Sequence, residues 1–215
     1  MKKVQRKTVE DYLRRYEEDY LYFHDIKNYE KKREILLKNK KISLSELNCW
    51  LSENVSSDPY TKFLSRKNTK CDLLYDYLYP DILYIKTSYF DIAIAKKMIS
   101  LIKHSDKKYL IIDVRDNCGG SIEAVIAIID CLIDQDVICS LEYRKKTIFY
   151  RSDEGKTQYE KIFMITNKNT MSSAELLTMS LILSTDNTYM IGKDTYRKGI
   201  GQISLFDKRS NISFS

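Results

Sequence analysis

YLIIDVRDNCGGSIEAVIAIIDCLID, residues 109–134, contains a strand, a turn and a helix in direct succession. Its first six residues form a short apolar run of the kind expected in a buried strand. The turn ends in Gly119 and Gly120, and an apolar run of helical length follows at once. The free N–H groups and the positive dipole end of that helix are therefore expected to point back toward the turn. Because glycine has no Cβ, the two glycines also let the backbone approach a bound molecule closely.

The same alternation of strand and helix continues on both sides of this stretch. Upstream, ILYIKT (82–87) is predicted as a strand and FDIAIAKKMISLIKH (90–104) as a helix. The downstream predictions are a hairpin or bent strand pair at 137–151, a buried strand at 161–166, a helix at 172–183, a strand at 188–192, and a final hairpin within 200–215 that turns at DKRSN. Alternating strands and helices predict an α/β fold, with a twisted sheet and flanking helices.

The first 66 residues have a helical pattern instead. TVEDYLRRYEEDYLYF (8–23) places apolar and aromatic residues at three- and four-residue intervals, which is typical of an amphipathic helix. NYEKKREILLKN (28–39) is predicted as a second helix. Ser43 followed by Glu46 is a capping-box pattern that opens a third. We therefore expect a small N-terminal helical region over residues 1–66.

Length and composition limit the class of protein. The chain has 215 residues and is 43% hydrophobic, enough for one sizeable core and a helical appendage. It has no apolar run of about 18 residues and no signal peptide pattern, so we expect a cytoplasmic protein without a transmembrane segment. The five cysteines show no CxxC spacing and are expected to be reduced thiols rather than metal ligands.

The net charge of +6 comes from the basic excess of residues 1–70. No nucleic-acid-binding motif accompanies that charge, so we interpret it as a solvated helix face and expect no nucleic-acid partner.

Two further segments, TMSSAE (170–175) and RKGIGQ (197–202), contain the residue types of a serine–lysine catalytic site. A serine hydroxyl is a weak nucleophile and needs a base within hydrogen-bond reach. Lysine serves as that base only when neutral, so burial must lower its pKa from about 10.4. Gln202, four residues after Lys198, is suited to hold the amine without adding charge. A single serine near a helix start is most often only an N-cap, but three such segments rarely coincide by chance.

Together the three segments resemble the S41 family of serine peptidases, the tail-specific or carboxy-terminal processing proteases. The family patterns are DLRxNxGG, TASAAE, and FGKG followed two residues later by Gln. Matching positions here are Asp113, Arg115, Asn117, Gly119 and Gly120, then Thr170, Ser172 and Glu175, then Lys198, Gly199 and Gln202. The departures are Met171 for a small residue, Cys118 for a frequent proline and Arg197 for a glycine.

The resemblance implies roles for six residues and a fold. Ser172 would be the nucleophile, Lys198 its base and Gln202 the residue that positions the lysine. Backbone N–H groups of Ser173 and of Gly119 or Gly120 would form the oxyanion hole. No metal or cofactor is implied. The family fold is a crotonase- or ClpP-like twisted sheet with flanking helices.

One domain of the family is missing. DPYTKFL (58–64) looks like the DPYTRFL segment that in the family normally precedes a PDZ domain. Only about twenty residues separate it from the strand at 82, too few for any independent domain. We therefore expect a linker at 67–81 and a catalytic core at 82–215, a PDZ-less layout similar to that of the nisin-resistance peptidases.

The expected activity is hydrolysis of short or carboxy-terminal peptide segments, with the peptide bound by strand addition beside the glycine turn. The alternatives are a catalytically silent peptide-binding module and an acyl-CoA enzyme, since the crotonase fold also supports that chemistry. The Ser and Lys motifs argue against the acyl-CoA enzyme.

Family members usually continue past the final hairpin, so residue 215 is a candidate truncation point of the core. A partner chain or self-association would then cover an edge strand. Asp113 and Arg115 are expected to form an ion pair that shapes the glycine turn. His24 and His104 lie outside the three motifs, so a Ser–His triad is not expected.

Overall fold

The computed structural model of the chain describes residues 3–54, 60–65, 72–134, 137–153, 159–202, 204–207 and 212–214. The chain forms two compact units, each continuous in space but not in sequence. Unit 1 comprises Met1–Asn68, Glu142–Thr147 and Gly201–Ser215, and unit 2 comprises Thr69–Leu141 and Ile148–Ile200.

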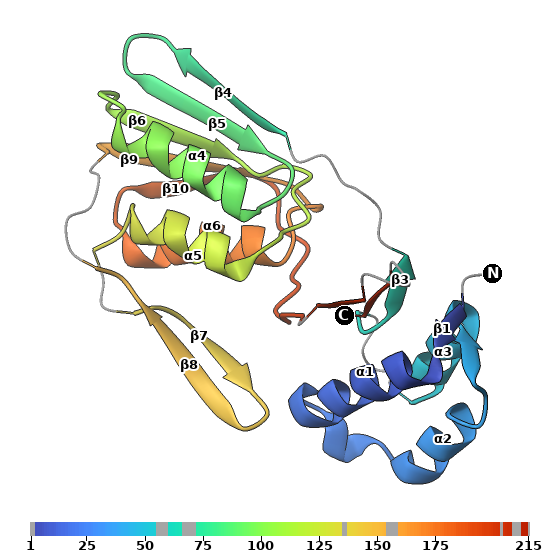
Figure 1. Cartoon of the computed structure of the whole chain (residues 1–215). Coiled ribbons are helices and arrows are strands. Elements are labelled where there is room, and N and C mark those ends of the chain that lie inside the picture. Colours follow the sequence, from blue (N-terminus) through green and yellow to red (C-terminus); the bar gives the residue numbers. More distant parts are fainter. Residues whose placement is uncertain are drawn as a thin grey trace. The chain divides into compact units, whose positions relative to one another are not determined.

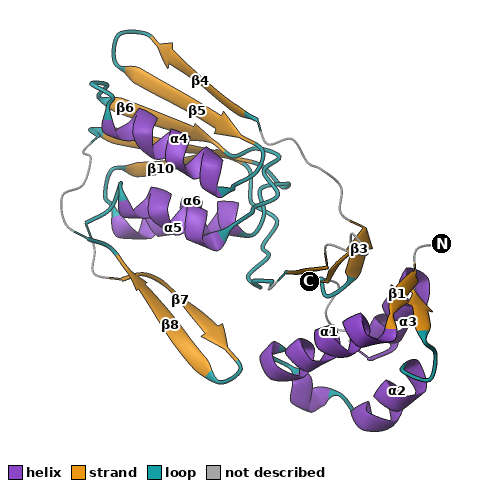
Figure 2. Cartoon of the chain, in the orientation of Figure 1, coloured by secondary structure: helices purple, strands orange, loops and turns teal. Residues whose placement is uncertain are grey.

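Unit 2 is built on a five-stranded mixed sheet in the order β10-β9-β6-β5-β4 (Figures 1 and 2). Its strands are β4 Leu73–Leu78, β5 Ile82–Thr87, β6 Tyr109–Asp113, β9 Lys161–Thr166 and β10 Thr188–Gly192. β4 pairs antiparallel with β5, whereas the other neighbours pair parallel. The predicted α/β class, with the strands at 82–87, 109–114, 161–166 and 188–192, is confirmed.

Three helices cover one face of this sheet, as the ribbon shows (Figure 1). They are α4 Ile92–Lys103, α5 Ile122–Asp130 and α6 Ser173–Ser184. Alternate strand residues point to the same face, and those on the helix side are fully or almost fully buried in one apolar core with the helices. They are Leu83, Ile85, Leu110, Ile112, Ile162 and Met164. The N-caps of α4 and α5 are Asp91 and Ser121, whose side chains accept from the N–H groups of Ile94 (2.8 Å) and Ala124 (3.1 Å).

The parallel pairing places the functional segments. β6, β9 and β10 all run in the same direction, so the segments that follow them leave the same edge of the sheet. These are the glycine turn after β6, the serine segment between β9 and α6, and the lysine segment after β10. The carboxyl edge of a sheet with parallel strands is the usual place for a ligand site.

β4 was not predicted. Residues 67–81 were interpreted as a linker, and six of them form this edge strand. The sequence LLYDYL has no alternation of apolar and polar residues, because β4 lies at the sheet edge with five of its six residues exposed. The predicted strand pair at 137–151 is present as the hairpin of β7 Val137–Tyr143 and β8 Lys146–Arg151.

Unit 1 contains the three predicted N-terminal helices, α1 Arg6–Asp19, α2 Tyr29–Leu36 and α3 Leu44–Asn54. A short 3-10 helix at Phe23–Asp25 follows α1, and β1 Lys3–Gln5 pairs antiparallel with β2 Lys41–Ser43. The predicted capping box opens α3: the Ser43 N–H donates to Glu46 Oε2 (2.7 Å) and the Glu46 N–H donates to Ser43 Oγ (3.2 Å). The apolar faces of the helices form a separate core, which includes Val9, Leu13, Tyr16, Leu47 and Trp50.

The predicted C-terminal hairpin is present as β11 Leu205–Asp207 and β12 Ile212–Phe214, which pair antiparallel. The expected turn at 207–211 lies mostly outside the described residues. β12 also pairs with β3 Phe63–Ser65, so the tail belongs to unit 1, although its residues were predicted as part of the core. Within the described ranges, no helix is both long enough and apolar enough to cross a membrane.

Candidate active site

Backbone and side-chain hydrogen bonds join the three motif segments at the carboxyl edge of the sheet. The Met171 N–H donates to the Asn117 carbonyl oxygen (2.9 Å), which ties the serine segment to the glycine turn. Thr170 Oγ1 donates to the Val114 carbonyl oxygen (2.8 Å), and the Tyr196 N–H donates to the Thr170 carbonyl oxygen (2.9 Å). Thr170 and Asn117 are both fully buried, so these contacts lie inside unit 2.

Ser172 lies at the sharp turn that begins α6. Its backbone has φ 58° and ψ −123°, a conformation that a residue with a side chain rarely adopts. Such strain persists only where the surroundings impose it, and it is often found at functional sites. Ser173 is the first residue of α6, so its N–H has no intrahelical partner. The positive end of the helix dipole favours negative charge at this position.

The glycine turn packs directly against the serine turn. A Cβ placed on Gly119, which has φ 95°, would lie 2.9 Å from Ser172 Cβ and 3.2 Å from the Ser173 nitrogen. A Cβ on Gly120, which has φ 150°, would lie 2.0 Å from the Phe90 carbonyl oxygen. Both positions therefore require glycine, and the structure brings Gly119 next to Ser172 and Ser173.

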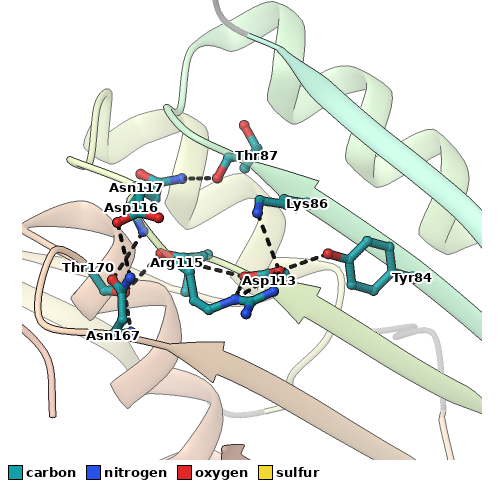
Figure 3. Close-up of polar contacts among 10 residues, drawn as sticks. Tyr84, Lys86, Thr87, Asp113, Arg115, Asp116, Asn117, Asn167 and Thr170 are labelled. Carbon is teal, nitrogen blue, oxygen red and sulfur yellow. Dashed lines mark hydrogen bonds and ion pairs between the residues drawn. The ribbon is translucent and has the colours of Figure 1, made fainter. Parts of the chain in front are cut away.

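The side chain of Asn117 binds the backbone N–H of Gly119 but not that of Gly120. Its Oδ1 accepts the Gly119 N–H (2.8 Å), and its Nδ2 donates to the Thr87 carbonyl oxygen (2.9 Å; Figure 3). The Gly119 N–H is thus already occupied. The Gly120 N–H donates to no residue that the structure describes. The bonds between this turn and Phe90 use its neighbours: the Phe90 N–H donates to the Gly119 carbonyl oxygen, and the Ser121 N–H donates to the Phe90 carbonyl oxygen.

Lys198 lies in an irregular segment that follows β10. Glu175, which is 9% exposed, accepts two backbone N–H groups of that segment: Arg197 at Oε1 (2.6 Å) and Lys198 at Oε2 (2.9 Å). Glu175 Oε2 also accepts the Ser172 N–H (2.8 Å). One carboxylate therefore connects the backbones of the two predicted catalytic residues, a contact that the sequence analysis did not anticipate.

Gln202 belongs to unit 1. Its side chain is exposed, and Nε2 donates to the Tyr60 carbonyl oxygen (2.7 Å), a contact within unit 1. Lys198 belongs to unit 2. The predicted role of Gln202 in positioning Lys198 stays a prediction.

A charged cluster lies at the end of β6, beside the glycine turn (Figure 3). Asp113 is fully buried, and Arg115 donates to it through Nε (2.9 Å) and Nη2 (2.6 Å), so the expected ion pair is present. Tyr84 Oη donates to Asp113 Oδ2 (2.7 Å), and Lys86 Nζ lies 3.8 Å from the same oxygen.

The cluster changes the protonation of its members. Burial acts to raise the pKa of Asp113, but the hydrogen bonds from Arg115 and Tyr84 and the charge of Lys86 outweigh it, and the pKa is lowered. Burial and the bond to Asp113 raise the pKa of Tyr84. Asp113 is therefore held as a carboxylate that fixes the residues preceding the glycine turn.

A second polar group joins the same turn to the segment before α6. Asp116 has φ 62°, and its carboxylate accepts from Asn169 Nδ2 (2.7 Å) and Asn167 Nδ2 (3.0 Å). The Asp116 N–H donates to Asn167 Oδ1 (3.1 Å). The side-chain bonds lower the pKa of Asp116, and the bond from Asn169 has the largest effect, followed by the bond from Asn167. Sequence reasoning missed both asparagines, because nothing in their local pattern indicates a partner some fifty residues away.

The structure also places the two histidines and the side chains of metal-ligating type. Across the part of the chain that the structure describes, no group of three or more His, Cys, Asp and Glu side chains is arranged to hold a metal ion. His104 is the C-cap of α4, with Nδ1 2.8 Å from the Ser100 carbonyl oxygen, and His24 lies in the 3-10 helix of unit 1.

Comparisons with known proteins complete the description. No curated protein matches the sequence. A lipoprotein from Streptococcus agalactiae has a similar structure, with TM-score 0.73 and 19% identity, over 97% of this chain and 82% of that one. A photosystem II D1 C-terminal processing protease has TM-score 0.50 and 22% identity, over 62% of this chain and only 35% of that one. At these identities the likeness concerns the fold. The family model of peptidase family S41 matches residues 81–212, more than half of the sequence, and the chain belongs to that family.

Proposed function

We propose that this chain is a serine peptidase that hydrolyses peptide bonds with Ser172 as nucleophile and Lys198 as base, acting on short or carboxy-terminal peptide segments. The observation that carries the proposal is the contact between two turns. Ser172 sits in a strained conformation at a helix N-terminus, and Gly119 of the glycine turn lies against its Cβ. This contact supports a site in which Ser172 is the nucleophile and neighbouring backbone N–H groups are the donors, the combination that acyl transfer requires.

The proposed reaction has two stages. Ser172 Oγ attacks the scissile carbonyl carbon while the neutral amine of Lys198 takes the hydroxyl proton. The tetrahedral intermediate collapses, the C–N bond breaks, and the Lys198 ammonium returns the proton to the leaving amine. Water then attacks the acyl ester with Lys198 again as base, which releases the carboxylic acid and restores Ser172. Gln202 is proposed to position Lys198, as in the family pattern.

The oxyanion donors are proposed to be the N–H groups of Gly120 and Ser173. The Gly119 N–H is a poorer candidate because Asn117 Oδ1 already accepts it at 2.8 Å. Removal of one oxyanion donor typically costs about 100- to 1000-fold in rate. Glycine at 119 is then needed for close approach to the serine turn, and glycine at 120, whose N–H is the proposed donor, for close approach to the Phe90 backbone.

A fluorophosphonate probe, which reacts with activated serines, tests the proposal. Labelling is measured between about pH 6 and pH 10, so that the upper end approaches the ordinary lysine pKa. We expect the wild-type chain to be labelled, and Ser172→Ala and Lys198→Ala not to be. Ser173→Ala is the matched control, because only the backbone of that residue has a proposed role.

Loss of labelling in Ser173→Ala, with labelling retained in Ser172→Ala, would place the nucleophile one residue further along. Absence of labelling at every pH would contradict the proposal and favour a catalytically silent peptide-binding module. Peptide binding that survives Ser172→Ala distinguishes that module from an unfolded protein.

A further inference from the structure

We infer that Glu175 is a positioning residue: its carboxylate holds the lysine-bearing segment against the serine turn. The inference rests on the proposed function, because it concerns how Lys198 is brought to Ser172. Three backbone N–H groups converge on the two oxygens, those of Ser172 (2.8 Å) and Lys198 (2.9 Å) at Oε2 and that of Arg197 (2.6 Å) at Oε1.

An ordinary capping box shows how unusual this arrangement is. In α3 the carboxylate of Glu46 accepts the N–H of its own N-cap residue, Ser43, at 2.7 Å. Glu175 does the same for Ser172 in α6, three residues before it. Unlike Glu46, Glu175 also accepts two N–H groups from a segment more than twenty residues away in sequence. The same carboxylate therefore caps α6 and connects the serine turn with the lysine segment.

The lysine segment depends on such a link because it has no regular structure. Residues 193–202 form neither helix nor strand, so no hydrogen-bond ladder fixes the backbone of Lys198. The Tyr196 N–H is bonded to the Thr170 carbonyl oxygen (2.9 Å), and the next two N–H groups are bonded to Glu175. Consecutive bonds from residues 196, 197 and 198 therefore attach the segment to the start of α6.

The geometry requires a carboxylate. An ionised carboxylate is an acceptor at both oxygens, with room for about four hydrogen bonds, and bonds to a charged acceptor are stronger than neutral ones. In Glu175→Gln one oxygen becomes an NH2 donor that faces an N–H group. Such a variant loses the bond to Arg197 or the pair of bonds to Ser172 and Lys198, whichever way the amide turns.

The bonds from the backbone also argue against a role for Glu175 as the base of Ser172. Both of its oxygens accept N–H groups of the protein, and the residue is 9% exposed. A carboxylate used in this way is not available to take the proton of Ser172. Glu175 therefore acts through Lys198 and does not touch the reacting atoms.

The test compares Glu175→Gln with Glu46→Gln, the same change at the other capping box. The first readout is the rate of fluorophosphonate labelling as a function of probe concentration. We expect the maximal rate to fall about 100-fold in Glu175→Gln, the size of effect that a small misplacement of a catalytic group produces. The probe concentration at half-maximal rate should stay unchanged, and Glu46→Gln should label like the wild type.

The second readout does not depend on activity. Amide hydrogen exchange is measured by mass spectrometry on peptides that cover residues 196–200. We expect faster exchange there in Glu175→Gln than in the wild type, because the N–H groups of Arg197 and Lys198 lose their acceptor. Glu46→Gln should leave exchange in these peptides unchanged. A thermal unfolding midpoint for each variant confirms that the comparison is made on folded protein.

The outcomes separate the two proposals. If the wild type is labelled and Glu175→Gln is labelled at the same maximal rate, the inference is overturned. Amide hydrogen exchange at residues 196–200 that is the same in Glu175→Gln as in the wild type also overturns it. If the wild type is not labelled, the proposed function fails, yet faster exchange in Glu175→Gln still supports the link to the lysine segment. Should Glu175→Gln not fold, Glu175→Asp replaces it: one methylene shorter, it keeps the charge but cannot reach both segments, and the same two criteria apply.

Discussion

Replacement of Asp113 by asparagine removes one charge from the cluster beside the glycine turn and keeps the shape of the side chain. Asp113 is fully buried, and its oxygens accept from Arg115 Nε (2.9 Å), Arg115 Nη2 (2.6 Å) and Tyr84 Oη (2.7 Å). In the variant an NH2 group takes the place of one acceptor and faces these donors. Arg115 and Lys86 also lose the negative charge that they share.

The expected cost follows from burial. Removal of one partner from a buried ion pair typically destabilises a protein by about 3–5 kcal/mol. The side chains of Arg115 and Lys86 are 46% and 35% exposed, so water compensates part of the loss. We therefore expect the lower end, about 3 kcal/mol, which for a chain of this length lowers the thermal midpoint by about 6–12 °C.

The dependence on pH gives the sharper test. The pKa of Asp113 is lowered on folding, so its contribution is complete above the unfolded value of about 3.9 and is lost as the pH falls through the folded value. Urea denaturation should show the full difference between wild type and Asp113→Asn at neutral pH. The difference should begin to shrink below about pH 4, where the unfolded chain takes up a proton at Asp113, and it should be lost once the pH has fallen below the lowered pKa of Asp113 in the folded chain.

Asp116→Asn is the control on the same turn. Its carboxylate is exposed and accepts from two asparagines, so we expect a smaller loss of stability. Equal stability of Asp113→Asn and wild type at neutral pH would refute the reasoning. So would a difference that persists unchanged in acid.

Two further substitutions test the glycine turn. Gly120→Ala should fail to reach the native fold in circular dichroism, because the added Cβ would lie 2.0 Å from the Phe90 carbonyl oxygen. Gly199→Ala is its control and should fold normally, because no atom lies within 4 Å of the added Cβ. Asn117→Ala leaves the Gly119 N–H and the Thr87 carbonyl without partners and should cost about 1–3 kcal/mol for each in urea denaturation. The same variant should also lose probe labelling, and wild-type stability or labelling would contradict the proposed role of the turn.

Much of the architecture was accessible from local patterns. The runs at 82–87 and 161–166 are strands because their apolar, β-branched residues are buried in a largely parallel sheet, and the capping box at Ser43 opens a helix as its spacing predicts. The edge strand β4 was missed because its residues are mostly exposed and carry no alternation. Burial pattern, the signal on which such predictions rest, is weakest at the edge of a sheet.

For the candidate site too, some features were predictable from local patterns and others were not. Residue types, their spacing and the family resemblance were sufficient to select the serine, lysine and glycine segments as candidates, because each is a short motif with its own chemistry. The catalytic roles of their residues stay predictions. The pairing of β12 with β3, the occupation of the Gly119 N–H by Asn117 and the convergence of three N–H groups on Glu175 required the folded chain. These contacts join residues that are distant in sequence or set the direction of a single N–H group, and both depend on how the strands and helices pack rather than on any local pattern.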